Sequence, residues 1–118
     1  MSYIDGFLVP VQSGKKEEYR AVATKAAAVF KKNGAIRVVE TWGDDLKDGK
    51  LTDFKMSVKA EAGENVVFSW IEWPSKAARD EGMKKTMEDP MMQSGSAEMP
   101  FDGMRMIFGG FSVLLDSK

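Results

Sequence analysis

The spacing of apolar residues changes along the first 42 residues, and this change predicts a strand, a helix and a second strand. Residues 3–11 (YIDGFLVPV) are mostly aromatic, β-branched or apolar, which is typical of a strand, and Pro10 places its end at a sheet edge or a bulge. Over residues 15–33 the apolar positions recur at the spacing of one helical face, with Ser13 as the expected N-cap. Residues 35–42 (AIRVVETW) predict the second strand.

The middle of the chain predicts two more strands after an acidic loop at residues 43–50 (GDDLKDGK). Residues 52–59 (TDFKMSVK) alternate strictly between apolar and polar, as expected for a strand with one face in water. Residues 66–73 (VVFSWIEW) are apolar on both faces, which favours a central strand that is covered on both sides.

The last third of the chain predicts one helix and one strand. Ser75 is the expected N-cap of a helix over residues 76–88, which Asp89-Pro90 ends. Residues 91–99 are predicted to be irregular, and residues 105–115 (RMIFGGFSVLL) to form the final strand.

The predicted order is β-α-β-β-β-α-β, within a single α+β domain that spans residues 1–118. Treating 52–59 as one additional strand leaves βαββαβ, the ferredoxin-like pattern, with an antiparallel sheet and both helices on one face. The opposite face is expected to be apolar too, and a second copy of the same sheet is the simplest cover for it. We therefore expect a homodimer, with the opposite face formed by residues such as Phe7, Val9, Phe68 or Trp70.

Two residue types are missing from the 118-residue chain, which contains no Cys and no His. Their absence excludes thiolate nucleophiles, disulfides, Cys/His zinc sites, Ser-His-Asp triads and haem held by a proximal His. The acidic loop has Leu46 and Lys55 where a calcium loop needs carboxylates, so we expect no metal and no cofactor.

The charge and the hydropathy pattern limit the partners and the location. Seventeen basic residues balance 18 acidic ones, so binding to RNA or another nucleic acid is disfavoured. No apolar run is long enough for a membrane helix, and the first residues do not resemble a signal peptide. We expect a cytoplasmic protein without a membrane partner.

Charged residues interrupt several of the apolar strands, and tryptophans lie beside them in the sequence. A charge in a buried strand is retained when it is paired or functional. One interpretation is a pocket with aromatic walls, in which Asp5 or Glu72 is a base of raised pKa and Arg105 binds an anion. The other, which we favour, is a structural network of ion pairs at the sheet or dimer interface. The candidate ligand-pocket residues are Asp5, Trp42, Trp70, Glu72, Trp73 and Arg105.

Several motifs resemble the small bacterial family of unknown function DUF1428. They are residues 40–45 (ETWGDD), 49–54 (GKLTDF), 66–76 (VVFSWIEWPSK) and 99–103 (MPFDG), and the resemblance extends over essentially the whole chain. It implies a ferredoxin-like domain of the dimeric α+β barrel superfamily, which includes cofactor-free monooxygenases, isomerases, haem enzymes and ligand-sensing domains. The resemblance implies no activity, and the missing His disfavours the haem enzymes.

Two hypotheses follow for function. The first is a homodimer with a pocket for a small organic molecule, which works as a cofactor-independent enzyme if a carboxylate shuttles a proton. The alternative is a non-catalytic binding or assembly module, in which the same charges only fix the register of the dimer.

Overall fold

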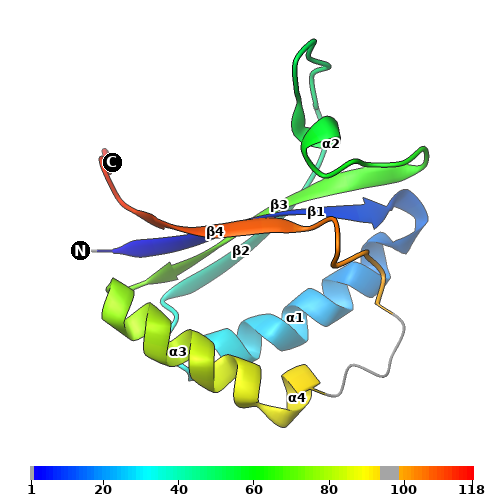
Figure 1. Cartoon of the computed structure of the whole chain (residues 1–118). Coiled ribbons are helices and arrows are strands. Elements are labelled where there is room, and N and C mark those ends of the chain that lie inside the picture. The colour runs from blue at the N-terminus through cyan, green and yellow to red at the C-terminus, as the bar shows by residue number, and fades with distance from the viewer. Residues whose placement is uncertain (1, 94–98) are drawn as a thin grey trace.

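The computed structural model describes residues 2–93 and 99–118, and its elements alternate between strands and helices (Figure 1). Among the described residues, three short helical elements accompany four strands and two long helices. The short elements are η1 (Ser13–Lys15), α2 (Phe54–Ser57) and α4 (Pro90–Gln93). The longer elements, in chain order, are β1 (Tyr3–Gln12), α1 (Lys16–Lys32), β2 (Arg37–Trp42), β3 (Glu64–Trp73), α3 (Lys76–Glu88) and β4 (Ile107–Ser112).

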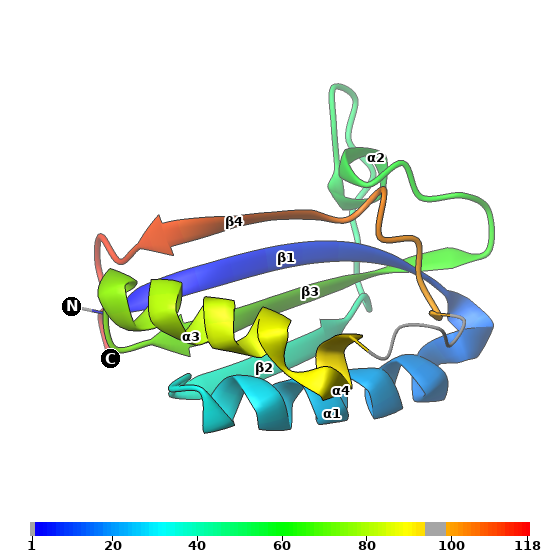
Figure 2. The same cartoon turned by 60° about the horizontal axis from the view of Figure 1, so that its bottom comes forward.

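The four strands form one antiparallel sheet in the order β2-β3-β1-β4, which confirms the ferredoxin-like prediction. Both long helices cover the same face of this sheet (Figure 2). The segment predicted to be central, 66–73, lies within β3 between β2 and β1. Pairing of β1 with β4 stops at Leu8, so Pro10 lies beyond the end of that ladder.

Helix α1 follows from its sequence at both ends. Acidic residues occupy its first turn and lysines its last turn, which suits the helix dipole. Gly34 follows with a φ of 111°, a conformation that glycine adopts without steric cost. The expected N-cap Ser13 is wrong, because Ser13 begins the turn η1 and Lys15 precedes α1 without a side-chain cap.

The core lies between the sheet and the two helices. One cluster contains Val9, Val11, Tyr19, Ala23 and Val67, and a second contains Phe30, Ala35, Ile71 and Trp73. Phe7 packs against both clusters, so Phe7 and Val9 face the helices. Their predicted place on the opposite face is wrong, because alternate β1 residues point to opposite sides and the odd-numbered ones point towards the helices.

The opposite side of the sheet, which we call the outer face, carries apolar side chains that the long helices do not cover. The strand register places on it Ile4, Leu8, Phe68, Trp70, Ile107 and Phe111. Phe68 and Phe111 are 48% and 61% exposed. An apolar outer face therefore exists, as predicted, although two of its expected members differ.

The predicted strand over 52–59 is wrong, since these residues belong to an excursion that joins β2 to β3 and contains α2. We call residues 43–60 the arm; it rises from the sheet on the side away from the long helices (Figure 1). The extended backbone ends at Asp53. Its Oδ1 accepts a hydrogen bond from the Met56 amide at 2.7 Å and so caps α2. The alternation in this segment therefore does not reflect the pairing of a strand.

The final strand is shorter than predicted and occupies Ile107–Ser112 rather than 105–115. In the segment predicted to be irregular, residues 90–93 form α4, and residues 94–98 lie outside the described residues.

Candidate functional site

The six candidate pocket residues lie in four separate places. Asp5 and Trp73 point towards the helices from the two central strands, whereas Trp70 and Glu72 lie on the outer face. Trp42 lies at the end of β2 beside α1, and Arg105 precedes β4. The structure therefore joins some of these residues in pairs but does not gather all six around one cavity.

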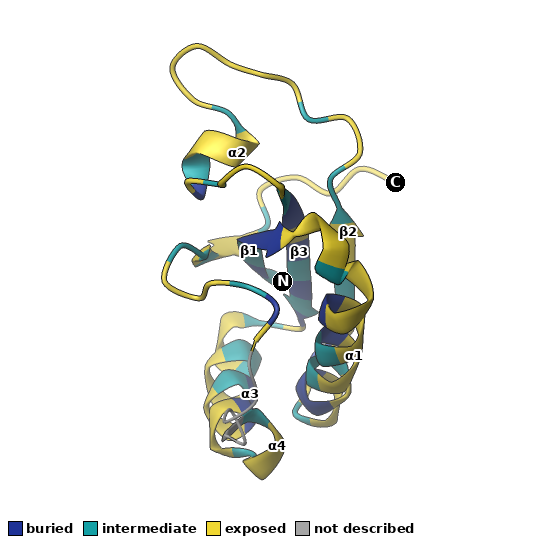
Figure 3. Ribbon diagram, turned by 90° about the vertical axis from the view of Figure 1, so that its right-hand side faces the viewer, coloured by how far each residue is buried: buried dark blue, intermediate teal, exposed yellow. Residues whose placement is uncertain are grey.

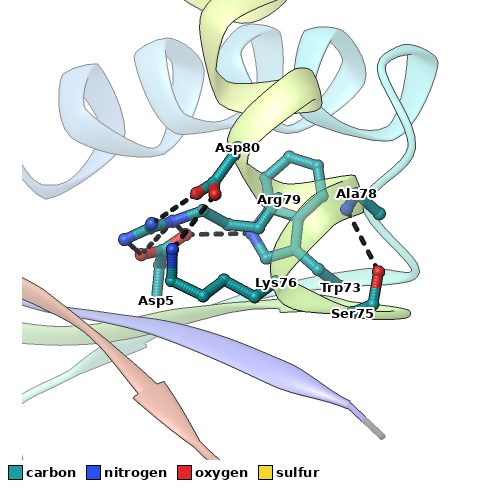
Figure 4. Close-up of polar contacts among 7 residues, drawn as sticks. All are labelled: Asp5, Trp73, Ser75, Lys76, Ala78, Arg79 and Asp80. Carbon is teal, nitrogen blue, oxygen red and sulfur yellow. Dashed lines mark hydrogen bonds and ion pairs between the residues drawn. The ribbon is translucent and has the colours of Figure 1, made fainter.

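Asp5 is enclosed by donors from β3 and α3 (Figure 4). The Trp73 indole donates to its Oδ2 at 2.9 Å, and Arg79 donates through Nε and Nη2 at 2.9 to 3.1 Å. Arg79 also bonds Asp80 and lies over the Tyr3 ring, with 5.0 Å between the guanidinium carbon and the ring centroid. The hydrogen bonds that Arg79 donates to Asp5 hold the pKa of Arg79 above its ordinary value. This network fastens α3 to β1 and β3.

Trp70 and Glu72 form a smaller network on the outer face. The Trp70 indole donates to Glu72 Oε2 at 3.2 Å, and Arg37 lies 3.6 Å from the same oxygen. The pair is separated by the sheet from Asp5 and Trp73, so these carboxylates cannot act on one ligand.

Arg105 is engaged through all three of its guanidinium nitrogens. It pairs with Glu64 at 2.7 and 2.8 Å, with Asp102 at 3.0 Å, and with the Lys59 carbonyl at 2.8 Å. Hydrogen bonds from Arg105 hold the pKa of the Glu64 carboxyl below its ordinary value. The arrangement is that of a structural network, with no guanidinium edge directed at an external anion.

A groove of about 450 Å³ runs between α1 and β2, within the size range of small-molecule sites. The small side chains Ala23 and Ala27 of α1 make room for it. Across the groove, β2 contributes Val38, Glu40 and Trp42. Of the six predicted residues, Trp42 alone lines this groove.

Tyr19 and Glu40 meet across the groove. The Tyr19 hydroxyl donates to Glu40 Oε1 at 2.7 Å, and Tyr19 itself is buried in the core. Partial desolvation against the groove wall raises the pKa of the Glu40 carboxyl, while hydrogen bonds from Tyr19 and Ser69 oppose this rise. Because β2 is an edge strand, the Glu40 side chain still reaches solvent. The groove thus holds a carboxyl that is both accessible and a stronger base than an ordinary glutamate.

In the sequence, Tyr19 belongs to the apolar stripe of its helix, and Glu40 is a charge that interrupts a strand. Part of the reason why Tyr19 and Glu40 meet lies in the strand pairing. Glu40 pairs with Ser69 across β2 and β3, so it faces the helices, as the Tyr19 ring does. Recognising the pair required knowing how α1 lies on the sheet.

Cations lie along the α1 side of the groove. The Lys16 ammonium lies 5.7 Å from the centroid of the Trp42 ring, and Arg20 bonds Glu17 at 3.3 Å on the exposed side of the helix. Both basic residues line the groove. The site therefore combines an apolar floor, one basic carboxylate and a positively charged wall.

The described ranges, 2–93 and 99–118, contain neither a cluster of metal ligands nor a membrane-spanning helix. No group of three or more acidic residues there is placed to hold a metal ion. No helix there is long and apolar enough to cross a membrane.

Solved structures share this fold at low sequence identity. The cofactor-independent oxygenase SnoaB from Streptomyces nogalater is 13% identical, with a TM-score of 0.61 over 98% of this chain and 95% of that one. A putative antibiotic biosynthesis monooxygenase from Bacillus cereus gives a TM-score of 0.59 at 13% identity, over 99% and 97% of the two chains. A NIPSNAP domain protein from Burkholderia xenovorans gives 0.60 at 13% identity, over 98% of each chain. These likenesses show that the chain shares its α+β fold with these proteins.

Sequence comparison gives a much nearer relationship. The uncharacterized protein YbaA of Escherichia coli K12 is 56% identical over 116 residues, which cover 98% of this chain and 99% of that protein. YbaA of Shigella flexneri matches equally well. The model of the protein family of unknown function DUF1428 matches residues 2–103. The chain belongs to the DUF1428 family.

Proposed function

We propose that the groove between α1 and β2 binds a small, weakly acidic organic molecule, a phenol or a β-dicarbonyl, and that Glu40 accepts a proton from it. The observation that carries this proposal is the Tyr19–Glu40 hydrogen bond inside a groove of about 450 Å³. A raised pKa brings a carboxylate closer to the range in which general bases work at neutral pH.

Each side chain has a distinct part in this transfer. Glu40 takes the proton and becomes a neutral acid, while the ligand becomes an anion. Tyr19 keeps the carboxyl oriented through its hydroxyl. Lys16 and Arg20 on the groove wall favour the negative charge that the ligand gains. The fold shared with a cofactor-independent oxygenase supports an enzyme that works through its own side chains.

We also propose that the protein is a homodimer in which two outer faces pack together. The exposed apolar residues of that face support this arrangement, since monomeric proteins rarely leave such a patch uncovered. The match to the dimeric α+β barrel fold supports it as well. A two-fold arrangement leaves the groove open, because the groove lies on the helix side of the sheet.

Ligand-observed NMR with a panel of phenols and β-dicarbonyls tests the binding site. Ala27→Trp fills the groove, and we expect it to abolish the binding of any hit. The matched control is Ala21→Trp, which places the same ring on the exposed side of α1 and should leave binding unchanged. Hits that bind equally well to Ala27→Trp would refute the groove.

The role of Glu40 is tested separately by following deuterium exchange of an acidic C–H in a bound β-dicarbonyl. We expect the wild type to accelerate exchange and Glu40→Gln to lose at least tenfold of that acceleration while retaining binding. Equal exchange rates in both proteins would refute proton transfer by Glu40 and would favour a binding module without catalysis. A panel without any hit would favour the assembly module, for which the paired charges of Asp5 and Arg105 already provide a structural role.

A further inference from the structure

The groove between α1 and β2 changes in character along its length. The α1 residues that line it recur every three or four positions, as one face of a helix does. They are Lys16, Tyr19, Arg20, Ala23, Thr24 and Ala27. Figure 3 shows α1 with buried and intermediate residues on the side towards the sheet and exposed residues on the side away from it. Since a helix rises by 1.5 Å per residue, the lining face extends for about 16 Å from its first residue to its last.

Strand β2 runs along this face in the direction opposite to α1. Two contacts fix the alignment: the Lys16 ammonium lies 5.7 Å from the centroid of the Trp42 ring, and Tyr19 bonds Glu40 at 2.7 Å. Farther along, Val38 packs against the core cluster that contains Phe30. Successively earlier residues of β2 therefore lie beside successively later residues of α1.

This alignment places all the groups that can handle charge at one end of the groove. We call the part around Lys16, Tyr19 and Glu40 the polar end. Arg20 is already bonded to Glu17 at 3.3 Å, whereas Lys16 forms no ion pair with any of the residues that the structure describes. Its ammonium thus remains to stabilise an anion that forms beside Glu40.

The opposite end of the groove is made of Ala23, Ala27 and Val38, and we call it the apolar end. The Thr24 hydroxyl beside it donates to the Arg20 carbonyl at 2.7 Å, so this donor is not offered to a ligand. From Tyr19 to Ala27 the helix rises by about 12 Å, which leaves room for an aryl ring beyond the acidic group of a ligand. An apolar group that enters this end leaves water, which favours binding.

We infer that the ligand is elongated, with its acidic group at the polar end and an aryl ring at the apolar end, against Ala27 and Val38. This inference rests on the proton transfer proposed above and adds to it the class and the orientation of the ligand. That class is an aryl-substituted β-dicarbonyl or a phenol with an apolar extension. A small dicarbonyl such as acetylacetone would occupy only the polar end of a groove of about 450 Å³.

A pair of β-dicarbonyls tests the class of ligand. Benzoylacetone differs from acetylacetone by a phenyl ring in place of one methyl group. We expect it to bind the wild type at least about tenfold more tightly, as judged by ligand-observed NMR titration, because the ring is buried.

A substitution at the apolar end shows whether this advantage arises there. Ala27→Asp places a charge beside the phenyl ring, so the ratio of the two dissociation constants should fall by at least about fivefold. The matched control is Ala28→Asp, which carries the same charge on the exposed side of α1 and should leave the ratio unchanged.

Intermolecular NOEs in the wild type with bound benzoylacetone test the orientation directly. We expect the phenyl protons to contact the methyl groups of Ala27 and Val38, and the acetyl methyl group to contact the Trp42 ring. A phenyl ring on Trp42, or a ratio that is unchanged in Ala27→Asp, would overturn the orientation and leave proton transfer by Glu40 standing. If neither dicarbonyl binds the wild type, the groove itself is refuted as their binding site, and the inference is refuted with it.

Discussion

Asp5 and Glu40 are both carboxylates on the helix-facing side of the sheet, yet they have opposite surroundings. Asp5 is 3% exposed on a central strand and receives hydrogen bonds from Trp73 and Arg79. Glu40 lies on an edge strand, receives the Tyr19 hydroxyl, and borders a groove that reaches solvent. One carboxylate is enclosed by its own chain, and the other can still meet a ligand.

The comparison separates two reasons for placing a charge in a strand. Burial alone made Asp5 a candidate from the sequence, but its donors leave it no room for a ligand. Glu40 has a raised pKa and an open side, which a catalytic base needs. Accessibility and a raised pKa are therefore the two properties that distinguish Glu40 from Asp5 as a candidate base.

The largest loss of stability is expected when the hydrogen-bond network around Asp5 is disrupted. Arg79→Met leaves the buried Asp5 carboxylate without its charged partner, and we expect the free energy of unfolding to fall by about 3–5 kcal/mol. Urea unfolding followed by circular dichroism measures it. Asp80→Asn, which removes only the exposed partner of Arg79, should cost less than about 1 kcal/mol. Equal losses in the two variants would contradict the special place of Asp5.

A smaller loss of stability is expected from Gly82→Ala. The new methyl group would contact Trp73, whose indole donates a hydrogen bond to Asp5. A Cβ at residue 82 would meet the Trp73 ring and come within 2.5 Å of the Asn33 carbonyl oxygen. Overpacking of this kind costs about 1–3 kcal/mol, more than the ~1 kcal/mol that alanine gains over glycine in a helix.

Thermal unfolding of Gly82→Ala should therefore show a lowered Tm. Gly14→Ala is the control, because nothing lies within 4 Å of a Cβ there. A raised Tm in Gly82→Ala would show that helix propensity outweighs the close contact with Trp73.

Arg105→Gln probes a second enclosed carboxylate, Glu64, through the pH dependence of stability. The folded pKa of Glu64 lies below its ordinary value of 4.5 because Arg105 bonds the charged form. This stabilisation is present above pH 4.5 and is lost as the pH falls through the folded pKa. The gap in unfolding free energy between wild type and Arg105→Gln should therefore narrow from pH 7 to pH 3. A constant gap would argue against the ion pair.

The smallest effect on stability, with the opposite sign, is expected from Glu40→Gln. Because the folded pKa of Glu40 is raised, its contribution is favourable below its ordinary value of 4.5 and is lost as the pH rises through the folded pKa. Glu40→Gln should thus be slightly more stable than wild type at pH 7, and the difference should vanish below pH 4. A variant that is less stable at pH 7 would show that Glu40 is structural.

Much of the fold could be predicted from periodicity, because the long helices and central strands bury one face or both. The segment 52–59 shows where this reasoning fails. Its apolar and polar residues alternate as in a strand, but Asp53 caps a helical turn there. Strict alternation over eight residues does not reveal whether a neighbouring strand exists to pair with it. Phe7 and Val9 were assigned to the wrong face for a related reason: the register of β1 is set by its partners.

The site was less predictable than the fold. Asp5 stands out in the sequence as a charge in an apolar strand, but Arg79 does not, because the pair is 74 residues apart and depends on how α3 packs. Glu40 is likewise a charge within a strand, whereas Tyr19 has the pattern of an ordinary core residue. The groove between them results from the small side chains of Ala23 and Ala27, whose effect on space becomes visible only once α1 lies on the sheet.

The strand order also bears on how the chain folds as it is synthesised. β1 leaves the ribosome first, yet it is a central strand whose partners are β3 and β4, with Tyr3 opposite Ser112. Until β4 emerges, the nascent chain holds a hydrophobic strand with one side unpaired. Such non-local pairing slows folding and exposes an edge that other chains can join. Truncation near the C-terminus should therefore harm this protein far more than its exposed final residues suggest.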